Sequence, residues 1–179
     1  MGDRFDRLFV KLAARYKISS PAPLVGNQEP SQMTAVYLHT HRVTHDEIDQ
    51  QGHVHNLRYL QWTLSAASKH SAASGWDAEA ALQNGIGWVV RSHDITYRAA
   101  AMADDELLIQ TWICDLNPIA IRRRAAIFRP ADRRLLAKVE TRWVLADLRA
   151  HKAIRLDAAI LSSLQVVASP PQPPWHATQ

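Results

Sequence analysis

Four segments in the second half of the chain alternate between hydrophobic and polar residues, and this period of two predicts β-strands. They span residues 88–99, 106–116, 119–130 and 134–148. The last segment alternates most clearly, because its hydrophobic face takes every second residue from Leu135 to Leu145. The sequences "LNP" and "RPADRR" separate successive strands with turn-forming residues, so we expect these strands to pair antiparallel.

A further strand and one long helix are predicted ahead of these segments. Residues 35–43 alternate as a strand does, and residues 56–74 carry a helical stripe that ends at Gly75. The stripe consists of Leu57, Leu60, Leu64, Ala67 and Ser71. Asp77 can cap a short second helix. The long helix is available to cover the apolar face of a five-stranded antiparallel sheet, which predicts an α+β fold.

The two ends of the chain differ in pattern from this middle part. Residues 1–33 contain a short amphipathic helix followed by a linker rich in proline, and residues 166–179 form a proline-rich tail that we expect to be extended and disordered. The remaining residues, 34–165, are predicted to fold as one domain, which suits a chain of 179 residues.

Composition narrows the class of protein. The net charge of +4 is compatible with an anionic ligand but is too small and too scattered for nucleic-acid binding. The single cysteine, Cys114, excludes a disulfide framework and suggests a reducing compartment. No apolar run approaches the roughly 20 residues that span a bilayer, and the N-terminus is a poor secretory signal. We therefore expect a cytoplasmic protein without a membrane span.

The stretch "VTHDEIDQQGHVHNLRYLQW" packs acids and histidines against the start of the predicted long helix. It resembles the start of hotdog-fold thioesterases, the 4-hydroxybenzoyl-CoA thioesterase-like and acyl-carrier-protein thioesterase-like families. The matching positions are Asp49, Gly52, His53, Val54, Asn56 and Tyr59. The segments at 95–107 and 142–160 resemble later parts of the same families, although Ala100 and Asp104 stand where proline and glycine are usual. The resemblance covers about residues 35–164 and implies a hotdog fold, in which a five-stranded sheet wraps around one central helix.

The resemblance also implies an activity, the hydrolysis of an acyl-CoA or acyl-carrier-protein thioester. Asp49 is then the general base or the nucleophile, and both routes remain open. Gly52 leaves room for the acyl group, and His53 or Asn56 orients water or donates to the carbonyl. The helix start offers unsatisfied N–H groups to the oxyanion.

The resemblance implies further site residues and a homo-oligomer, either a dimer or a dimer of dimers, with the active site where two subunits meet. The expected substrate-binding residues are Tyr59, Arg91, His93, Tyr97 and Arg98. We expect no cofactor beyond the coenzyme A of the substrate. The acyl group, and the choice between coenzyme A and carrier protein, stay open.

Other readings compete with this one. Asp46 and Asp49 can simply cap turns or the helix. The pairs His39/His41 and His53/His55 could begin a zinc site, but no further ligand pattern supports them, so we expect no metal. A hydratase or dehydratase acting on acyl thioesters and a non-catalytic acyl-CoA-binding module on the same fold are the alternatives in function.

Overall fold

The computed structural model describes residues 35–176, so the predicted N-terminal helix and linker lie outside the described part. The long strands are β1 (Val36–Arg42), β2 (Ile86–Tyr97), β3 (Glu106–Asn117), β4 (Ala120–Arg129) and β5 (Arg134–Asp147). The helices are α2 (Asn56–Ala73), α3 (Ala78–Gln83) and α4 (Ala158–Ser163). Shorter elements are the two-residue strand β6 (Lys152–Ala153) and the 3-10 turns η1 (His45–Glu47), η2 (Pro130–Asp132) and η3 (Pro174–His176). Each predicted strand and helix within the described residues is present.

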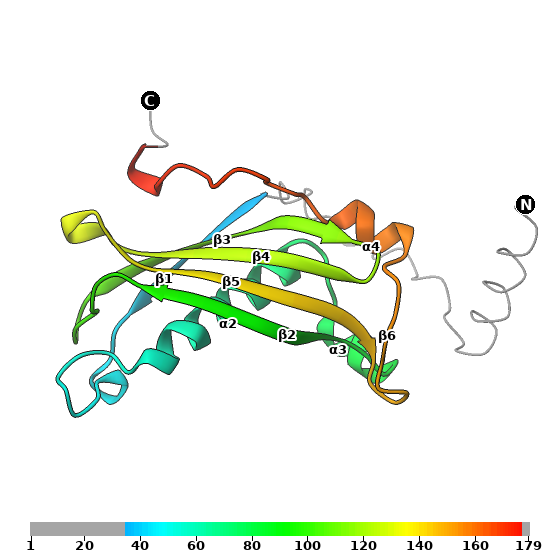
Figure 1. Ribbon diagram of the computed structural model, residues 1–179, viewed down its shortest axis with the longest axis horizontal. Helices are drawn as coiled ribbons and strands as arrows, with labels where there is room; N and C mark the ends of the chain where they lie inside the picture. The colour runs from blue at the N-terminus through cyan, green and yellow to red at the C-terminus, as the bar shows by residue number, and fades with distance from the viewer. Residues whose placement is uncertain (1–34, 177–179) are drawn as a thin grey trace, which may run out of the picture. The chain divides into compact units, whose positions relative to one another are not determined.

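The five long strands form one antiparallel sheet in the order β1-β3-β4-β5-β2, and β6 pairs with the end of β5. Tight turns join β3 to β4 and β4 to β5, as predicted, and Arg133 takes a positive φ of 55° in the second turn. The crossover through α2 and α3 carries the chain from β1 at one edge to β2 at the other. Figure 1 shows α2 lying against one face of the sheet.

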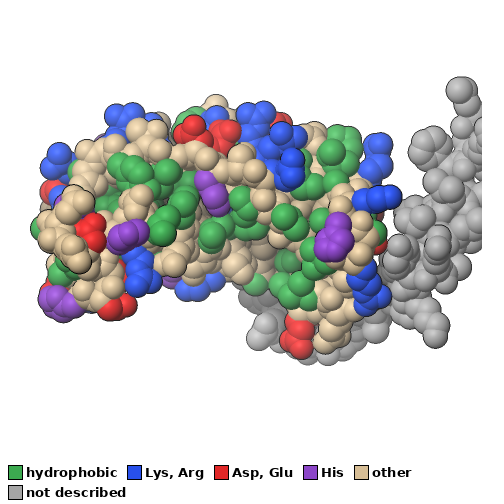
Figure 2. Space-filling view, turned by 60° about the horizontal axis from the view of Figure 1, so that its bottom comes forward, with side chains coloured by type: hydrophobic (Ala, Val, Ile, Leu, Met, Phe, Trp, Pro, Cys, Tyr) green, Lys and Arg blue, Asp and Glu red, His purple; other side chains and the backbone are tan. Residues whose placement is uncertain are grey.

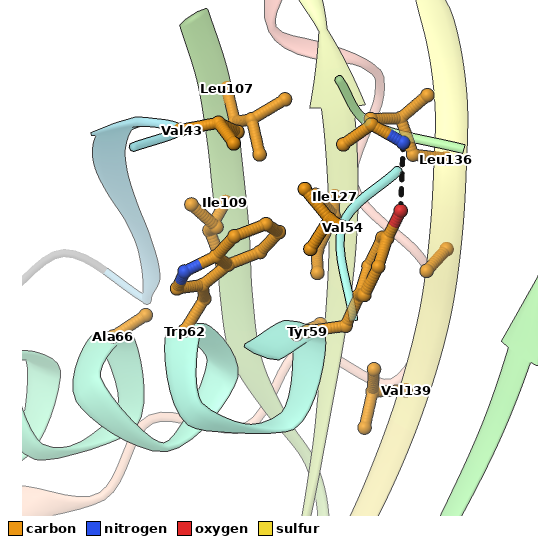
Figure 3. Packing of buried hydrophobic residues seen from close by; sticks show 13 residues of the cluster. Val43, Val54, Tyr59, Trp62, Ala66, Leu107, Ile109, Ile127, Leu136 and Val139 are labelled. Carbon is orange, nitrogen blue, oxygen red and sulfur yellow. Dashed lines mark hydrogen bonds between the residues drawn. The ribbon is translucent and has the colours of Figure 1, made fainter. Parts of the chain in front are cut away.

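Helix α2 buries only part of the predicted stripe, Ala67 fully and Leu60 partly, and it buries other side chains as well. The side chains that it turns towards the sheet are Tyr59, Trp62, Thr63, Ala66, Ala67 and His70. Leu57, which heads the predicted stripe, is 55% exposed. Tyr59 and Trp62 reach from α2 towards Ile109, Ile127 and Leu136 on the strands (Figure 3). The two aromatic side chains bury a larger area than the leucines would, which favours this rotation of the helix.

The proline-rich tail also differs from its prediction. Val166 forms an isolated parallel bridge with Ile113, and the N–H of Val167 donates to the Ile113 carbonyl at 2.8 Å. Farther along, Trp175 packs edge-on against Phe128 with the ring centroids 5.1 Å apart. Residues 166–173 are extended, as expected, and η3 follows them, but the segment runs along the sheet in place of the expected disorder (Figure 1). An apolar cluster around Trp112 and Phe128 gives the tail a surface on which to pack.

Candidate active site

The segment between Ile48 and Val54 forms a small closed loop directly ahead of α2. An antiparallel bridge joins Ile48 to Val54, and the Asp49 N–H donates to the His53 carbonyl at 2.9 Å. Gly52 has a φ of +80° and donates its N–H to the Asp49 carbonyl at 3.0 Å. A residue with a side chain rarely adopts this backbone conformation, so the glycine of the motif is needed for the turn itself.

The Asp49 carboxylate sits on this loop, with 20% of its side chain exposed. Its Oδ1 atom accepts a hydrogen bond from the Gln51 N–H at 2.8 Å. Its Oδ2 atom lies 3.8 Å from Nδ1 of His53 and accepts no hydrogen bond from the described residues. One oxygen is therefore held in place while the other remains available to a water molecule or a substrate.

Helix α2 begins directly after the loop. His55 is its N-cap residue, because its Nδ1 atom accepts the Leu57 N–H at 3.2 Å. The helix is therefore capped by a histidine, and Asp46 and Asp49 do not take the capping role. Within the described part of the chain, the N–H of Asn56 has no acceptor. A helix start carries a partial positive charge, so this N–H is available to an anionic oxygen.

Glu47 anchors the loop from below, and sequence reasoning missed it. Its side chain is buried, with 8% exposure, and accepts from Trp62 Nε1 at 2.8 Å and from the Thr44 N–H at 3.0 Å. The Nε2 atom of His41 also lies 2.8 Å from Oε2 of Glu47. Burial alone raises the pKa of Glu47, but these hydrogen bonds outweigh burial and lower it below the ordinary value. The sequence signal that could have identified Glu47 is that it is an acidic residue only two positions before Asp49.

Tyr59 was predicted to bind substrate, and the structure instead places it in the core. Its residue is only 3% exposed, and its hydroxyl oxygen accepts the Ala101 N–H at 2.8 Å, the dashed line in Figure 3. Burial raises the pKa of the hydroxyl. Because the ring also packs against Trp62 and Tyr97, Tyr59 supports the loop and the start of α2.

The residues predicted on and after β2 separate into two groups. Tyr97 lies beside the helix start, because its hydroxyl donates to the Asn56 carbonyl at 3.1 Å. Arg98 follows it and has no carboxylate partner within the described residues. Arg91 and His93 lie farther along the exposed edge strand, and no described contact joins them to Asp49. His93 instead contacts Thr141 Oγ1 at 2.9 Å, and burial lowers its pKa.

Comparison with protein-family profiles now adds to this geometry. The profile of the thioesterase-like superfamily matches residues 43–169, which include the loop, α2 and all the strands from β2 to β5. The chain belongs to the thioesterase-like superfamily. Comparison with curated protein sequences finds no significant match.

Solved structures support the same fold. A 1,4-dihydroxy-2-naphthoyl-CoA thioesterase from Synechocystis is 18% identical with a TM-score of 0.67, over 72% of this chain and 95% of that one. The corresponding enzyme from Staphylococcus aureus is 17% identical with a TM-score of 0.66, over 71% and 85%. A 4-hydroxybenzoyl-CoA thioesterase variant in complex with 4-hydroxybenzoyl-CoA is 20% identical with a TM-score of 0.68, over 74% and 100%. The predicted hotdog fold is confirmed.

This member of the thioesterase-like superfamily departs from the expected motif at Asp104, where glycine is usual. Asp104 has a positive φ of 66°, which explains the usual glycine. Its carboxylate instead pairs with Arg42 at 3.0 Å. The departure is therefore accommodated by a local ion pair on the surface.

Two other predictions concern metals and membranes. Within residues 35–176 no group of three potential metal-ligating side chains comes together. His41 contacts Glu47 and His55 caps α2, so the histidine pairs have other partners. None of the described helices combines the length and the apolar character that crossing a bilayer requires.

Proposed function

We propose that this protein hydrolyses the thioester of an acyl-CoA or acyl-carrier-protein substrate, with Asp49 as the group that initiates attack. The proposal rests on one observation. The Asp49 carboxylate lies on a closed loop that leads directly into the start of α2, and one of its oxygens is held while the other is unoccupied. Membership of the thioesterase-like superfamily supports the same reaction.

The loop supplies the group that initiates attack, and the start of α2 supplies the group that stabilises the oxyanion. Oδ2 of Asp49 takes a proton from water as the water attacks the carbonyl carbon, or it attacks that carbon directly. The Asn56 N–H at the helix start stabilises the oxyanion, a type of interaction worth about 3 kcal/mol in the transition state. The carbon–sulfur bond then breaks, and the thiolate leaves and takes up the proton that Asp49 received from the attacking water. On the direct route the acyl group stays on Asp49 as an anhydride, and a water molecule hydrolyses this anhydride to release the acid and restore the carboxylate, while the thiolate takes its proton from solvent. The acid and the free thiol are the products.

Neighbouring residues assist these steps. His53, whose Nδ1 lies 3.8 Å from Asp49, can orient the attacking water. A Cβ atom at Gly52 would meet nothing within 4 Å, so the space above the loop is open to an acyl group. Arg98, next to Tyr97, provides a positive charge without a carboxylate partner that suits a coenzyme A phosphate. No cofactor other than the coenzyme A of the substrate takes part in this scheme.

Replacing Asp49 by asparagine tests the proposal. Asp49→Asn keeps the size of the side chain and removes the base, so the rate of thiol release should fall about 100-fold or more. The free energy of unfolding should stay close to that of the wild type, because the side chain is partly exposed. Thiol release from a panel of acyl-CoA thioesters measures the rate.

Asp46→Asn is the matched control, because Asp46 lies on the same stretch with 77% of its side chain exposed. Its turnover should stay within about twofold of wild type, since surface substitutions have small effects. Equal turnover in the Asp49→Asn variant and the wild type would exclude Asp49 as the attacking group.

A homodimer that pairs two β2 strands is the assembly that we propose around this site. Strand β2 lies at the edge of the sheet and runs for 12 residues, and long exposed edge strands readily pair with another chain. Val89 on this strand and Leu57 on α2 are exposed hydrophobic residues, 40% and 55%. Figure 2 brings forward the side that carries α2 and β2 and shows hydrophobic side chains spread across it.

The cytoplasm is the proposed location, since a single buried cysteine suits a reducing compartment.

Val89→Glu tests this assembly against Ile119→Glu. Both residues are 40% exposed, but Ile119 lies in the turn between β3 and β4, away from the β2 edge. Val89→Glu should convert the dimer to a monomer in light scattering after size-exclusion chromatography, because it would bury a charge without a partner in the interface. Ile119→Glu should remain dimeric. A monomeric wild type would refute the assembly and leave the assignment of Asp49 unaffected.

A further inference from the structure

A cavity lies beneath the C-terminal half of α2, away from Asp49. It has a volume of about 270 Å³, is open on one side, and is bordered by α2, α3, the start of β2, and the inner faces of β4 and β5. Its walls are mostly apolar and include Ala67, Trp76, Ile86, Trp88 and Ile121. Ligand pockets begin at about 300 Å³, so this space suits a short acyl chain or a single ring and cannot hold a nucleotide.

Arg123 from β4 lines this apolar cavity with a buried positive charge. The residue is 5% exposed, and no carboxylate of a described residue lies within 4 Å of its guanidinium. Its described partners are not acidic: Nη1 lies 2.7 Å from His70 Nδ1, and Nη2 donates to Ser71 Oγ at 3.4 Å. Burial lowers the pKa of Arg123 to about 10, so the side chain still carries its charge at neutral pH.

The neighbouring arginines on β4 show that this situation is specific to Arg123. Arg122 pairs with Asp115 at 2.9 Å, and Arg124 pairs with Glu140 at 2.8 Å. Both of these side chains are partly exposed and could rely on water, yet each has a carboxylate. Arg123, which is buried and has the greatest need of a counter-charge, has none within the described residues.

Trp143 from β5 also lines the cavity. Its Nε1 atom is buried and has no hydrogen-bond partner. A buried N–H without an acceptor costs about 1–3 kcal/mol, so native structures seldom leave one unpaired. Arg123 and Trp143 therefore both line one mostly apolar space, and neither has an acidic partner within the described residues.

We propose that this cavity binds a carboxylate at the far end of the acyl group, with Arg123 as the residue that determines this specificity. The substrate class is then an ω-carboxyacyl thioester, that is, the thioester of a dicarboxylic acid. The inference rests on the proposed thioesterase function. A guanidinium matches a carboxylate with two parallel hydrogen bonds, and the apolar walls suit the methylene groups between the two carbonyl carbons.

The proposed dimer explains how a short acyl group can reach both places. Within one chain, the helical stretch from Asn56 to Ser71 separates them by about 22 Å, which exceeds the length of a short acyl chain. An antiparallel pairing centred on the middle of β2 sets the Ile86 end of one copy beside the Tyr97 end of the other. The cavity of one copy then opens near the catalytic loop of its partner.

A matched pair of substrates tests the inference. Adipoyl-CoA and hexanoyl-CoA have the same chain length and differ in a terminal carboxylate against a methyl group. The wild type should hydrolyse adipoyl-CoA with a kcat/KM at least about tenfold higher, because a hydrogen bond to a charged group is worth about 10- to 100-fold. Arg123→Met should lower kcat/KM for adipoyl-CoA by about that factor. Its kcat/KM for hexanoyl-CoA should stay within about threefold of the wild-type value.

Two further variants serve as a control and as a second test of the substrate preference. Arg122→Met removes the neighbouring, partly exposed arginine and should leave the preference unchanged. Trp143→Phe removes the unpaired N–H and should weaken the preference by a smaller factor than Arg123→Met, which gives a second reading if Arg123→Met folds poorly. A wild type that prefers hexanoyl-CoA, or a preference that survives in both Arg123→Met and Trp143→Phe, would overturn the inference.

A binding measurement separates this inference from the thioesterase function itself. Tryptophan fluorescence of the Asp49→Asn protein should change on titration with hexanoate and much less with neutral hexanamide, because Trp76, Trp88 and Trp143 line the cavity. Adding Arg123→Met should abolish the response to hexanoate. Arg123-dependent binding without any thioester hydrolysis would refute the function and keep the carboxylate site. Hydrolysis with no dependence on Arg123 in either assay would refute the site and keep the function.

Discussion

Glu47 and Arg123 are two buried charges under the same helix, and their surroundings differ. Glu47, near the start of α2, accepts hydrogen bonds from the Trp62 indole and the Thr44 N–H and contacts His41. Arg123, under the other half of α2, contacts His70 and Ser71 and has no carboxylate partner within the described residues. Trp62 uses its Nε1 atom on Glu47, whereas the Nε1 atom of Trp143 is left without an acceptor.

This difference in partners distinguishes a buried charge that stabilises the fold from one that is available to bind a ligand. A buried charge is costly unless hydrogen bonds or an opposite charge compensate for its lost hydration. Glu47 is compensated inside the chain, so it serves to hold β1, the loop and α2 together. Arg123 lines a cavity and is compensated only in part, so it has binding capacity left for a ligand.

The largest effect that we expect from this comparison is on stability. Glu47→Gln should lower the free energy of unfolding by about 3 kcal/mol, because it removes the charge from a buried, fully bonded network. Arg123→Met should change it by less than about 1 kcal/mol or increase it, since replacing an uncompensated buried charge by an apolar side chain is often neutral or stabilising. Urea denaturation followed by tryptophan fluorescence measures both.

The exposed Arg122→Met variant serves here as the control for loss of a β4 arginine and should stay within about 0.5 kcal/mol of wild type. If Arg123→Met lowers the free energy of unfolding as much as Glu47→Gln does, both charges stabilise the fold and the proposed difference between them is refuted.

A smaller effect should appear on acidification. The pKa of Glu47 is lower in the folded protein than its ordinary value of 4.5. Its contribution to stability is therefore complete above that value and is lost as the pH falls through the folded-state pKa. The difference in unfolding free energy between wild type and Glu47→Gln should narrow between pH 7 and about pH 3. A difference that stays constant over this range would mean that the Glu47 charge does not stabilise the fold.

Much of the fold could be predicted from local patterns. Alternation located all five long strands to within about two residues, and turn-forming residues identified the β3–β4 and β4–β5 connections. The buried face of α2 was predicted only in part, because spacing alone favoured Leu57 over Tyr59 and Trp62. The polar tips of these aromatic residues find partners, Ala101 and Glu47, only once the chain has folded.

The candidate site divides in the same way. Asp49, Gly52, His53 and Asn56 are neighbours along the chain, so one motif could group them, and the structure keeps them on one loop and helix start. Tyr59 shares the motif but points into the core, which a periodic pattern does not reveal for an aromatic residue with a hydroxyl group. Arg123 belonged to a run of three arginines, and only its register on β4 showed which one is buried.

The sequence by itself determined the order of strands and helices, the loop that carries Asp49 and the family to which the chain belongs. These features depend on residues close together in the chain, where periodicity and turn chemistry act directly. Tertiary structure alone decided which charges are compensated, because the partners of Arg123, His70 and Ser71, lie more than 50 positions away. Burial and hydrogen bonding across such separations follow from how α2 rests on the sheet.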